Sequence, residues 1–90
     1  MKRDIKKFLD GLVQAGLCYY FMPVQTGFGA STLDFLICYK GRFFAIETKR
    51  PDKPSKMTAR QEEIARRMRL AGGVVIVARD VELVKALMVD

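Results

Sequence analysis

The sequence predicts a small α/β domain with the element order α-β-β-β-α-β-α, in which helices cover both faces of a mixed sheet. Three observations lead to this fold class. The chain has 90 residues, half of them apolar, which is enough for one domain spanning residues 1–90 and one thin core. Apolar residues recur at three- and four-residue spacing in some segments, the helical period. Other segments are short apolar runs bounded by Gly or Pro, as strands are.

The first third of the chain predicts a helix, a strand and a loop. Apolar residues at helical spacing over residues 4–16 predict an amphipathic helix that Gly16 ends. Residues 17–24 are rich in aromatic residues and are interrupted by Pro23, which suits a strand near a sheet edge. Residues 25–32 contain two glycines and no periodicity, and we expect a loop there.

The next two runs, residues 33–39 and 42–48, predict a β-hairpin. They are separated by Lys40 and Gly41, and a two-residue connection with glycine second is typical of a tight hairpin turn. Both faces of the hairpin are largely apolar, so we expect both to be covered. The turn sets a register in which Asp34 lies opposite Glu47 and the inner pairs are Tyr39–Arg42, Cys38–Phe43, Ile37–Phe44, Leu36–Ala45 and Phe35–Ile46.

The second half predicts a loop, a helix, a strand and a last short helix. Residues 50–56 form a basic loop, and Thr58 with Gln61 makes a capping-box pattern at the start of a helix that the Gly72-Gly73 pair ends. The apolar stripe of that helix consists of Ile64, Ala65, Met68 and Ala71, and Gln61 continues it. Residues 73–78 form a continuous β-branched run, typical of a strand covered on both faces. Asp80 is expected to cap a final helix that runs to Met88.

Composition excludes several classes of function. The net charge of +6 and pI near 9.6 favour a polyanionic partner, nucleic acid before membrane. The chain has no histidine, which excludes catalytic triads, Cys-His dyads and His-ligated metal sites.

Cys18 and Cys38 form no CxxC pair, and we expect two buried thiols in a reducing cytoplasm. No apolar run approaches a membrane span, so we expect a soluble protein that is not secreted.

Asp34 and Glu47 are the candidate metal ligands. Two carboxylates that face each other across a ladder repel unless a cation lies between them. Hard oxygen ligands without histidine select Mg²⁺ or Mn²⁺. Lys49 lies two residues beyond Glu47 on the same face of the strand, and Gln61 points inward from the following helix. The set predicts metal-assisted hydrolysis of a phosphodiester, with Lys49 positioning water or neutralising developing charge.

Each of these residues also has a structural interpretation. Asp34, Glu47 and Lys49 would alternatively make an ordinary cross-strand salt-bridge set. Gln61 would alternatively be the capping-box partner of Thr58, a role that does not exclude a place in the site. A basic surface borders the site and predicts contact with the DNA backbone; the glycines of the 25–32 loop would let that backbone approach closely. The candidate DNA-binding residues are Arg50, Lys53, Lys56, Arg60, Arg67, Gly27 and Gly29.

Three segments resemble the VRR-NUC (virus-type replication-repair nuclease) branch of the PD-(D/E)XK nucleases. They are residues 29–34 (GASTLD), 41–49 (GRFFAIETK) and 58–61 (TARQ), followed by the AGGVVIV strand at 71–77. Together they contain the family's Asp, hairpin, ExK motif and helical Gln in order. Leu33 stands where the family typically has proline.

This resemblance implies a restriction-endonuclease-like sheet and a Mg²⁺- or Mn²⁺-dependent DNA endonuclease without organic cofactor. Asp34, Glu47 and the Thr48 backbone carbonyl would ligate the metal, Lys49 would serve the attacking water, and Gln61 would support the site. The family's first-helix acidic residue would fall at Asp4. Short stand-alone members are similar to Holliday-junction resolvases, which work as homodimers on branched DNA and include phage-encoded proteins of the bacterial cytoplasm.

Two other functions fit the same sequence. One is a nucleic-acid-binding module that has the fold without turnover, and the other is a phage structural protein that holds DNA on its basic face. Metal-dependent cleavage would separate the nuclease from both.

Overall fold

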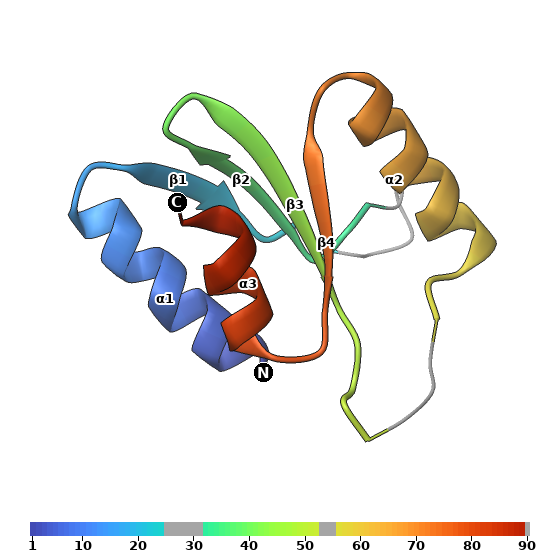
Figure 1. Cartoon of the computed structure of the whole chain (residues 1–90), viewed down its shortest axis with the longest axis horizontal. Coiled ribbons are helices and arrows are strands. Elements are labelled where there is room, and N and C mark those ends of the chain that lie inside the picture. The colour runs from blue at the N-terminus through green and yellow to red at the C-terminus, as the bar shows by residue number, and fades with distance from the viewer. Residues whose placement is uncertain (25–31, 53–55, 90) are drawn as a thin grey trace.

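The computed structural model describes residues 1–24, 32–52 and 56–89, and its element order is the one predicted. The predicted loop at 25–32 therefore lies outside the described residues, except for Thr32. The strands form one sheet in the order β1-β2-β3-β4, with antiparallel pairing up to β3 and a parallel β3–β4 pair (Figure 1). The elements are α1 (Lys2–Gln14), β1 (Cys18–Phe21), β2 (Phe35–Tyr39), β3 (Arg42–Thr48), α2 (Ala59–Leu70), β4 (Val74–Ala78) and α3 (Val81–Met88).

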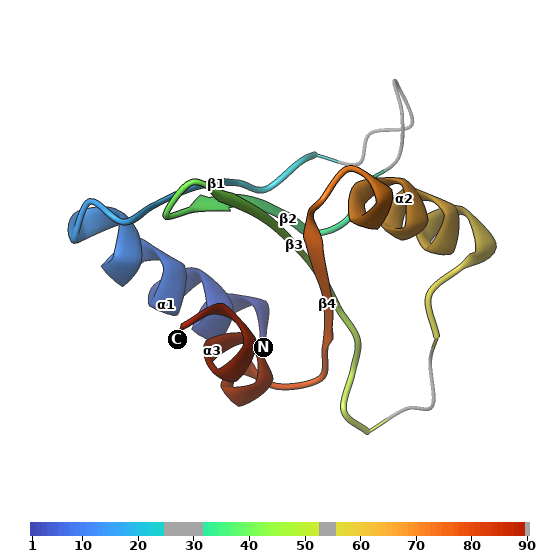
Figure 2. The same ribbon diagram turned by 45° about the horizontal axis from the view of Figure 1, so that its top comes forward.

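Helices lie on both sides of the sheet, as the sequence predicts. Figure 2 shows α1 and α3 together on one side and α2 on the other, beside β4. The main core lies between the sheet and the α1–α3 pair, because β2 and β3 direct large apolar residues to this side, namely Phe35, Ile37, Tyr39, Phe44 and Ile46. Its largest buried side chains include Ile5, Leu9, Phe35, Ile37, Phe44, Ile46, Ile76, Val84 and Met88.

The end of α1 is set by Gly16, as predicted. Gly16 has φ of +76°, the left-handed conformation that glycine adopts without steric cost. The chain reverses there, and the Leu17 amide donates to the Leu12 carbonyl at 3.0 Å. This reversal carries the chain directly into β1.

The hairpin has the predicted register. Lys40 and Gly41 both have positive φ, +50° and +77°, which is the turn geometry whose twist matches that of the flanking strands. All five predicted inner pairs, from Tyr39–Arg42 to Phe35–Ile46, are present. Asp34 directly precedes β2, so the same register carries it to the level of Glu47.

The prediction that both hairpin faces are covered is wrong for part of the face on the α2 side. Ala45 is buried there, but Phe43 is 41% exposed, and the neighbouring β1 exposes Tyr19 and Phe21 at 73% and 56%. A helix is about 10 Å wide and strands are about 4.8 Å apart, so α2 covers about two strands and leaves β1 and β2 open. The prediction of two buried thiols is also wrong: Cys38 is exposed on this open side, whereas Cys18 lies on the α1 side against the core and is half-buried, and both are free.

The two outer strands also differ from expectation in detail. β1 is an edge strand as predicted but is shorter, four residues instead of eight, and ends before Met22 and Pro23. β4 has α3 against one face and α2 against the other, yet it lies at the opposite edge and several of its valines are only half-buried. In the described ranges, no helix is long and apolar enough to cross a membrane.

Candidate active site

The candidate site lies at the end of the β2–β3 ladder farthest from the hairpin turn. Glu47 is in β3, and Asp34 reaches the same level from the residue before β2. Thr48, the residue after Glu47, holds Asp34 in place, because its amide and its hydroxyl donate to Asp34 Oδ2 at 2.9 and 2.7 Å. The negative charge of Asp34 acts on the pKa of Glu47, so the two predicted carboxylates lie within electrostatic reach of each other.

Glu47 is buried, with 4% of its surface exposed. Its Oε2 accepts a 2.7 Å hydrogen bond from Gln61 Nε2 and lies 3.3 Å from Lys49 Nζ. Its Oε1 is buried without any hydrogen-bond partner among the described residues. Burial, and next the negative charge of Asp34, raise the pKa of Glu47 above its usual range, although Lys49 acts in the opposite direction.

Asp34 has the opposite electrostatic balance. Burial works to raise its pKa, but the two Thr48 donors and Lys2 outweigh it, and the pKa of Asp34 is lowered. Lys2 Nζ lies 3.4 Å from Asp34 Oδ1. The sequence did not indicate this pair, because nothing local shows that the start of the first helix reaches the end of the hairpin.

Gln61 is the capping-box partner of Thr58, and its side chain also contacts the predicted site residues Lys49 and Glu47. Gln61 Oε1 accepts from the backbone N–H of Thr58 at 3.0 Å and from Lys49 Nζ at 3.2 Å. The backbone N–H of Gln61 in turn donates to Thr58 Oγ1 at 3.1 Å. The capping box is confirmed, and it holds the Gln61 Nε2 group against Glu47.

These residues suit a divalent cation with few protein ligands. The orphaned Oε1 of Glu47 and the Asp34 carboxylate are hard oxygen donors, and Mg²⁺ commonly takes one or two carboxylates with water and substrate phosphate completing its shell. The described residues contain no cluster of three or more acidic or Cys side chains, and Asp4 is exposed on α1 rather than grouped with the pair. The structure thus gives Asp4 no place beside the two carboxylates.

A groove of about 660 Å³ adjoins the site. Met1, Lys2, Thr48 and Lys49 line it together with residues 50–52. Two of these residues contact the candidate carboxylates: Lys2 contacts Asp34, and Lys49 contacts Glu47.

The predicted DNA-binding residues are exposed where the structure describes them. Arg50, Lys56, Arg60 and Arg67 lie on the surface. Some are partly neutralised: Arg50 pairs with Asp52 at 3.2 Å, and Arg67 pairs with Glu63 at 3.1 Å. The remaining three predicted residues, Gly27, Gly29 and Lys53, lie outside the described residues.

No protein-family model matches the chain, and no curated protein is similar enough to count as a match. The nuclease interpretation therefore depends on the residues and their geometry.

Proposed function

We propose that the chain is a Mg²⁺- or Mn²⁺-dependent endonuclease that hydrolyses DNA phosphodiester bonds. The observation that carries the proposal is the buried, unpartnered Oε1 of Glu47 beside a second carboxylate, that of Asp34. A buried acceptor without a partner destabilises a fold, and a ligand for it offsets that cost. The salt-bridge interpretation accounts for Oε2, which Lys49 and Gln61 satisfy, but leaves Oε1 unexplained.

The roles of the side chains follow from their contacts. A divalent cation held by Asp34 and Glu47, with the Thr48 carbonyl as a further donor, supplies Lewis-acid polarisation of the phosphate and a more acidic water. Gln61 fixes the Glu47 carboxylate and, through Oε1, the Lys49 ammonium. Lys49, only 13% exposed in its side chain, is held where it can orient water and neutralise charge that develops on the phosphate.

The proposed substrate is branched DNA of the Holliday-junction type. We place the cleavage in a reducing bacterial cytoplasm, and the family resemblance favours a phage-encoded protein. Ninety residues leave little chain for reading base sequence, so recognition by shape and phosphate contacts is favoured. The exposed arginines and lysines around the groove supply such contacts.

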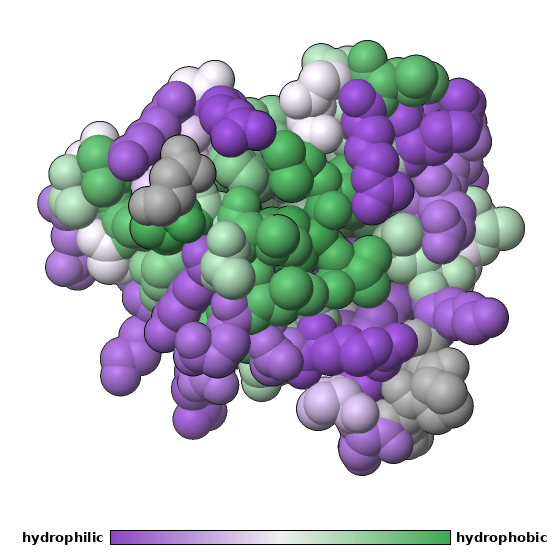
Figure 3. All heavy atoms as spheres, in the orientation of Figure 1, coloured by the Kyte–Doolittle hydropathy of each residue, from purple (hydrophilic) through white to green (hydrophobic). Residues whose placement is uncertain are grey.

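A homodimer would give two sites for two DNA strands, and one surface favours it. Figure 3 shows apolar side chains gathered over α3 and β4, and α3 exposes Leu83 and Leu87 at 39% and 52%. β4 is an apolar edge strand, and such edges are ready templates for pairing with another chain. Pairing two copies there would cover both features.

The experiment that tests the function uses labelled four-way junction, flap, linear duplex and single-stranded DNA. Each is incubated with Mg²⁺, Mn²⁺ or EDTA, with wild type, Glu47→Ala and the control Glu82→Ala on α3. We expect metal-dependent cuts placed symmetrically on the junction, absent for Glu47→Ala and retained for Glu82→Ala. Binding without cleavage in every metal would instead identify a DNA-binding module.

Multi-angle light scattering of wild type and Leu87→Glu tests the dimer, which the added charge should dissociate.

A further inference from the structure

The outer face of α1 carries cations that the core does not use. The helix buries Ile5 and Leu9 against the sheet. At 3.6 residues per turn, the opposite side of the helix carries a different set of residues. These line a groove of about 480 Å³ and are Arg3, Lys6, Lys7, Asp10, Gly11 and Gln14. Three cations and one carboxylate give this groove a positive net charge, and Asp4, the other carboxylate of α1, does not line it.

The cations of this groove differ in their partners. Lys6 Nζ pairs with Asp10 Oδ2 at 2.9 Å, and Asp10 Oδ1 accepts from the Tyr20 hydroxyl at 2.5 Å. This set neutralises Lys6 and ties α1 to β1. Arg3 and Lys7, in contrast, form no ion pair with any residue that the structure describes. They lie four positions apart, and like charges at this spacing repel and destabilise a helix, so within the chain their pairing has a cost and no return.

Gly11 extends the row that Arg3 and Lys7 begin, four positions further along the helix. It is exposed, its φ is not positive, and an added Cβ would meet no atom within 4 Å. Glycine is less favourable than alanine inside a helix, and neither the backbone nor the packing requires it here. Its missing side chain leaves the end of the row open to close approach by the backbone of a ligand.

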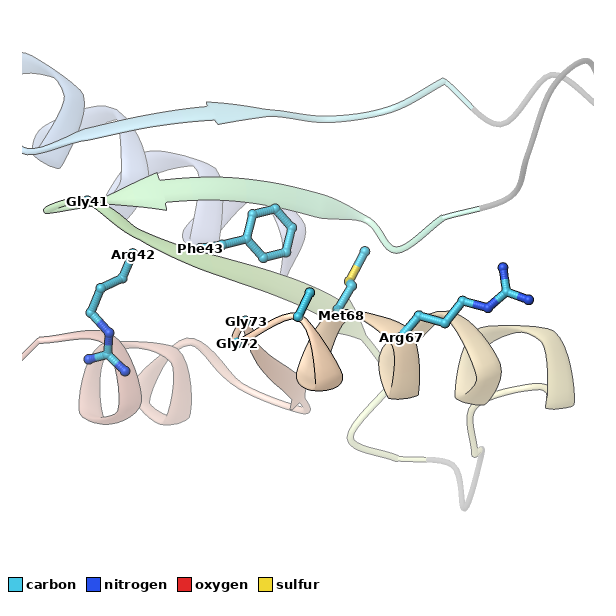
Figure 4. Close-up of a pocket in the computed structure, with 8 residues that line it drawn as sticks. Gly41, Arg42, Phe43, Arg67, Met68, Gly72 and Gly73 are labelled. Atoms are coloured by element: carbon cyan, nitrogen blue, oxygen red, sulfur yellow. The ribbon is translucent and has the colours of Figure 1, made fainter.

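The arginines of the groove near the hairpin turn are already engaged. Figure 4 shows Arg42 and Arg67 on opposite sides of that groove. The Arg42 guanidinium lies 5.4 Å from the centre of the Phe44 ring, and Arg67 pairs with Glu63 at 3.1 Å. A ligand there would compete with these contacts. On the outer face of α1, Arg3 and Lys7 offer their charges without such competition.

We propose that Arg3, Lys7 and Gly11 bind the phosphate backbone of a double-stranded DNA arm that leads away from the bond to be cut. Lys2, the residue before Arg3, contacts Asp34, so the row starts beside the candidate site. From Arg3 to Gly11 the helix rises about 12 Å. One DNA strand places about three or four phosphates in this length. The proposal rests on the proposed nuclease function, because it assigns these residues to the DNA that the site would cut.

Position and shape favour DNA over an anionic membrane as the occupant. The apolar side of α1 is packed in the core and is not available to enter a lipid layer. The row begins where Lys2 meets a candidate metal ligand, which a DNA substrate has to reach and a membrane does not. A glycine that admits close approach suits a narrow strand of phosphates better than a flat layer of headgroups.

The first test removes the two charges. Arg3→Gln/Lys7→Gln keeps residues of similar helix propensity, and Lys40→Gln/Arg42→Gln removes the same charge at the hairpin turn as the matched control. Fluorescence anisotropy measures the affinity of each protein for a labelled duplex of mixed sequence, in EDTA, over a series of salt concentrations. We expect Arg3→Gln/Lys7→Gln to weaken binding on the order of tenfold and to reduce the slope of log affinity against log salt by about 2. The control should change the slope by less than about 0.5.

The second test fills the space at Gly11. Gly11→Ala should raise the melting temperature by about 2–8 °C, because alanine favours the helix. The same change should weaken duplex binding about threefold or more, and Gly11→Gln should weaken it further, because each places atoms where the backbone of the DNA approaches. Stability and affinity thus change in opposite directions, so loss of folding does not explain the loss of binding.

Three results would refute the proposal: an unchanged salt slope in Arg3→Gln/Lys7→Gln, an equal change in the hairpin control, or wild-type affinity in Gly11→Ala. Cosedimentation with vesicles of phosphatidylserine and phosphatidylcholine covers the other occupant. Loss of vesicle binding in Arg3→Gln/Lys7→Gln, with DNA affinity unchanged, would assign the surface to a membrane instead. Every binding measurement omits metal. The proposal can therefore fail although the protein cleaves junctions, and it can hold although the protein cleaves nothing.

Discussion

Gln61 Nε2 donates a 2.7 Å hydrogen bond to Glu47 Oε2 while Gln61 Oε1 accepts from the amide of Thr58. One side chain thus both caps α2 and fixes a buried carboxylate of β3. The start of the helix and the geometry of the candidate site are coupled through this residue.

The two roles of Gln61 are separable by mutation. Thr58→Ala removes the capping hydroxyl at a cost of about 1 kcal/mol, which lowers the melting temperature by roughly 4–8 °C in a domain of this size. It leaves Gln61 in contact with Glu47, so cleavage at 25 °C should persist. Gln61→Ala should lower the melting temperature and also reduce cleavage on the order of 10²-fold. Equal loss of cleavage in both variants would show that Gln61 acts only through the helix.

Lys49 is expected to act on the reaction more than on binding. Lys49→Ala should abolish detectable junction cleavage while the dissociation constant for DNA in EDTA changes by no more than several-fold, because one lysine is a small part of the phosphate contact. Its neighbour Arg50, exposed and paired with Asp52, provides the control. Arg50→Ala should weaken binding similarly but retain cleavage at saturating protein. Cleavage by Lys49→Ala would contradict the role given to this lysine.

Glu47 makes the metal-free protein less stable as pH rises. Its pKa is raised in the folded state, so the folded state holds the proton more tightly than the unfolded state does. Stability therefore falls as pH rises from below the ordinary value of 4.5 through the raised pKa. Glu47→Gln lacks this titration. In EDTA, its melting temperature relative to wild type should increase across that pH window, and a constant or decreasing difference would contradict the raised pKa.

Lys2 would compete with a bound cation for Asp34, since its ammonium lies 3.4 Å from Oδ1. Lys2→Ala should lower the Mg²⁺ concentration for half-maximal cleavage by a few-fold. Lys6→Ala is the matched control on the same helix, because Lys6 pairs with Asp10. A metal titration of cleavage compares the two variants, and an equal effect would indicate a general change in charge instead.

Glu63 restrains two arginines of the basic surface. Arg66 first, and Arg67 next, hold the pKa of Glu63 at about 2, so this carboxylate stays ionised at any working pH. Glu63→Gln should tighten duplex binding at low salt and steepen the dependence of log affinity on log salt by up to about 1. Glu82→Gln, which frees only Lys85 on α3, should leave both quantities nearly unchanged. The same slope for all three proteins would exclude these arginines from the DNA interface.

The sequence predicted the features that depend on local chemistry. Lys40-Gly41 sets the hairpin register, and this register alone carries Asp34 to the level of Glu47. The Thr58–Gln61 capping box was predictable too, because it depends on two residues only three positions apart. The metal, the DNA substrate and the dimer stay predictions.

Features that depend on the packing of distant elements were not predictable from local patterns. The pairing of Lys2 with Asp34 requires the position of α1, and the exposure of Tyr19 and Cys38 requires knowing that α2 lies beside β4. An apolar strand face in the sequence indicates which residues could be buried. It does not show over which strands of the sheet a helix will lie, and so which of these residues it will cover.

The position of Met1 has a practical consequence for anyone preparing the protein. Met1 lines the groove beside Thr48 and Lys49, and Lys2 touches Asp34. Any residues joined ahead of Met1, whether a purification tag or a fused domain, would emerge at the mouth of the candidate site. A histidine tag there would bring imidazoles beside two carboxylates and create a metal chelator foreign to the chain. Assays of metal dependence should therefore use protein whose fusion partner has been cleaved off or attached behind Asp90.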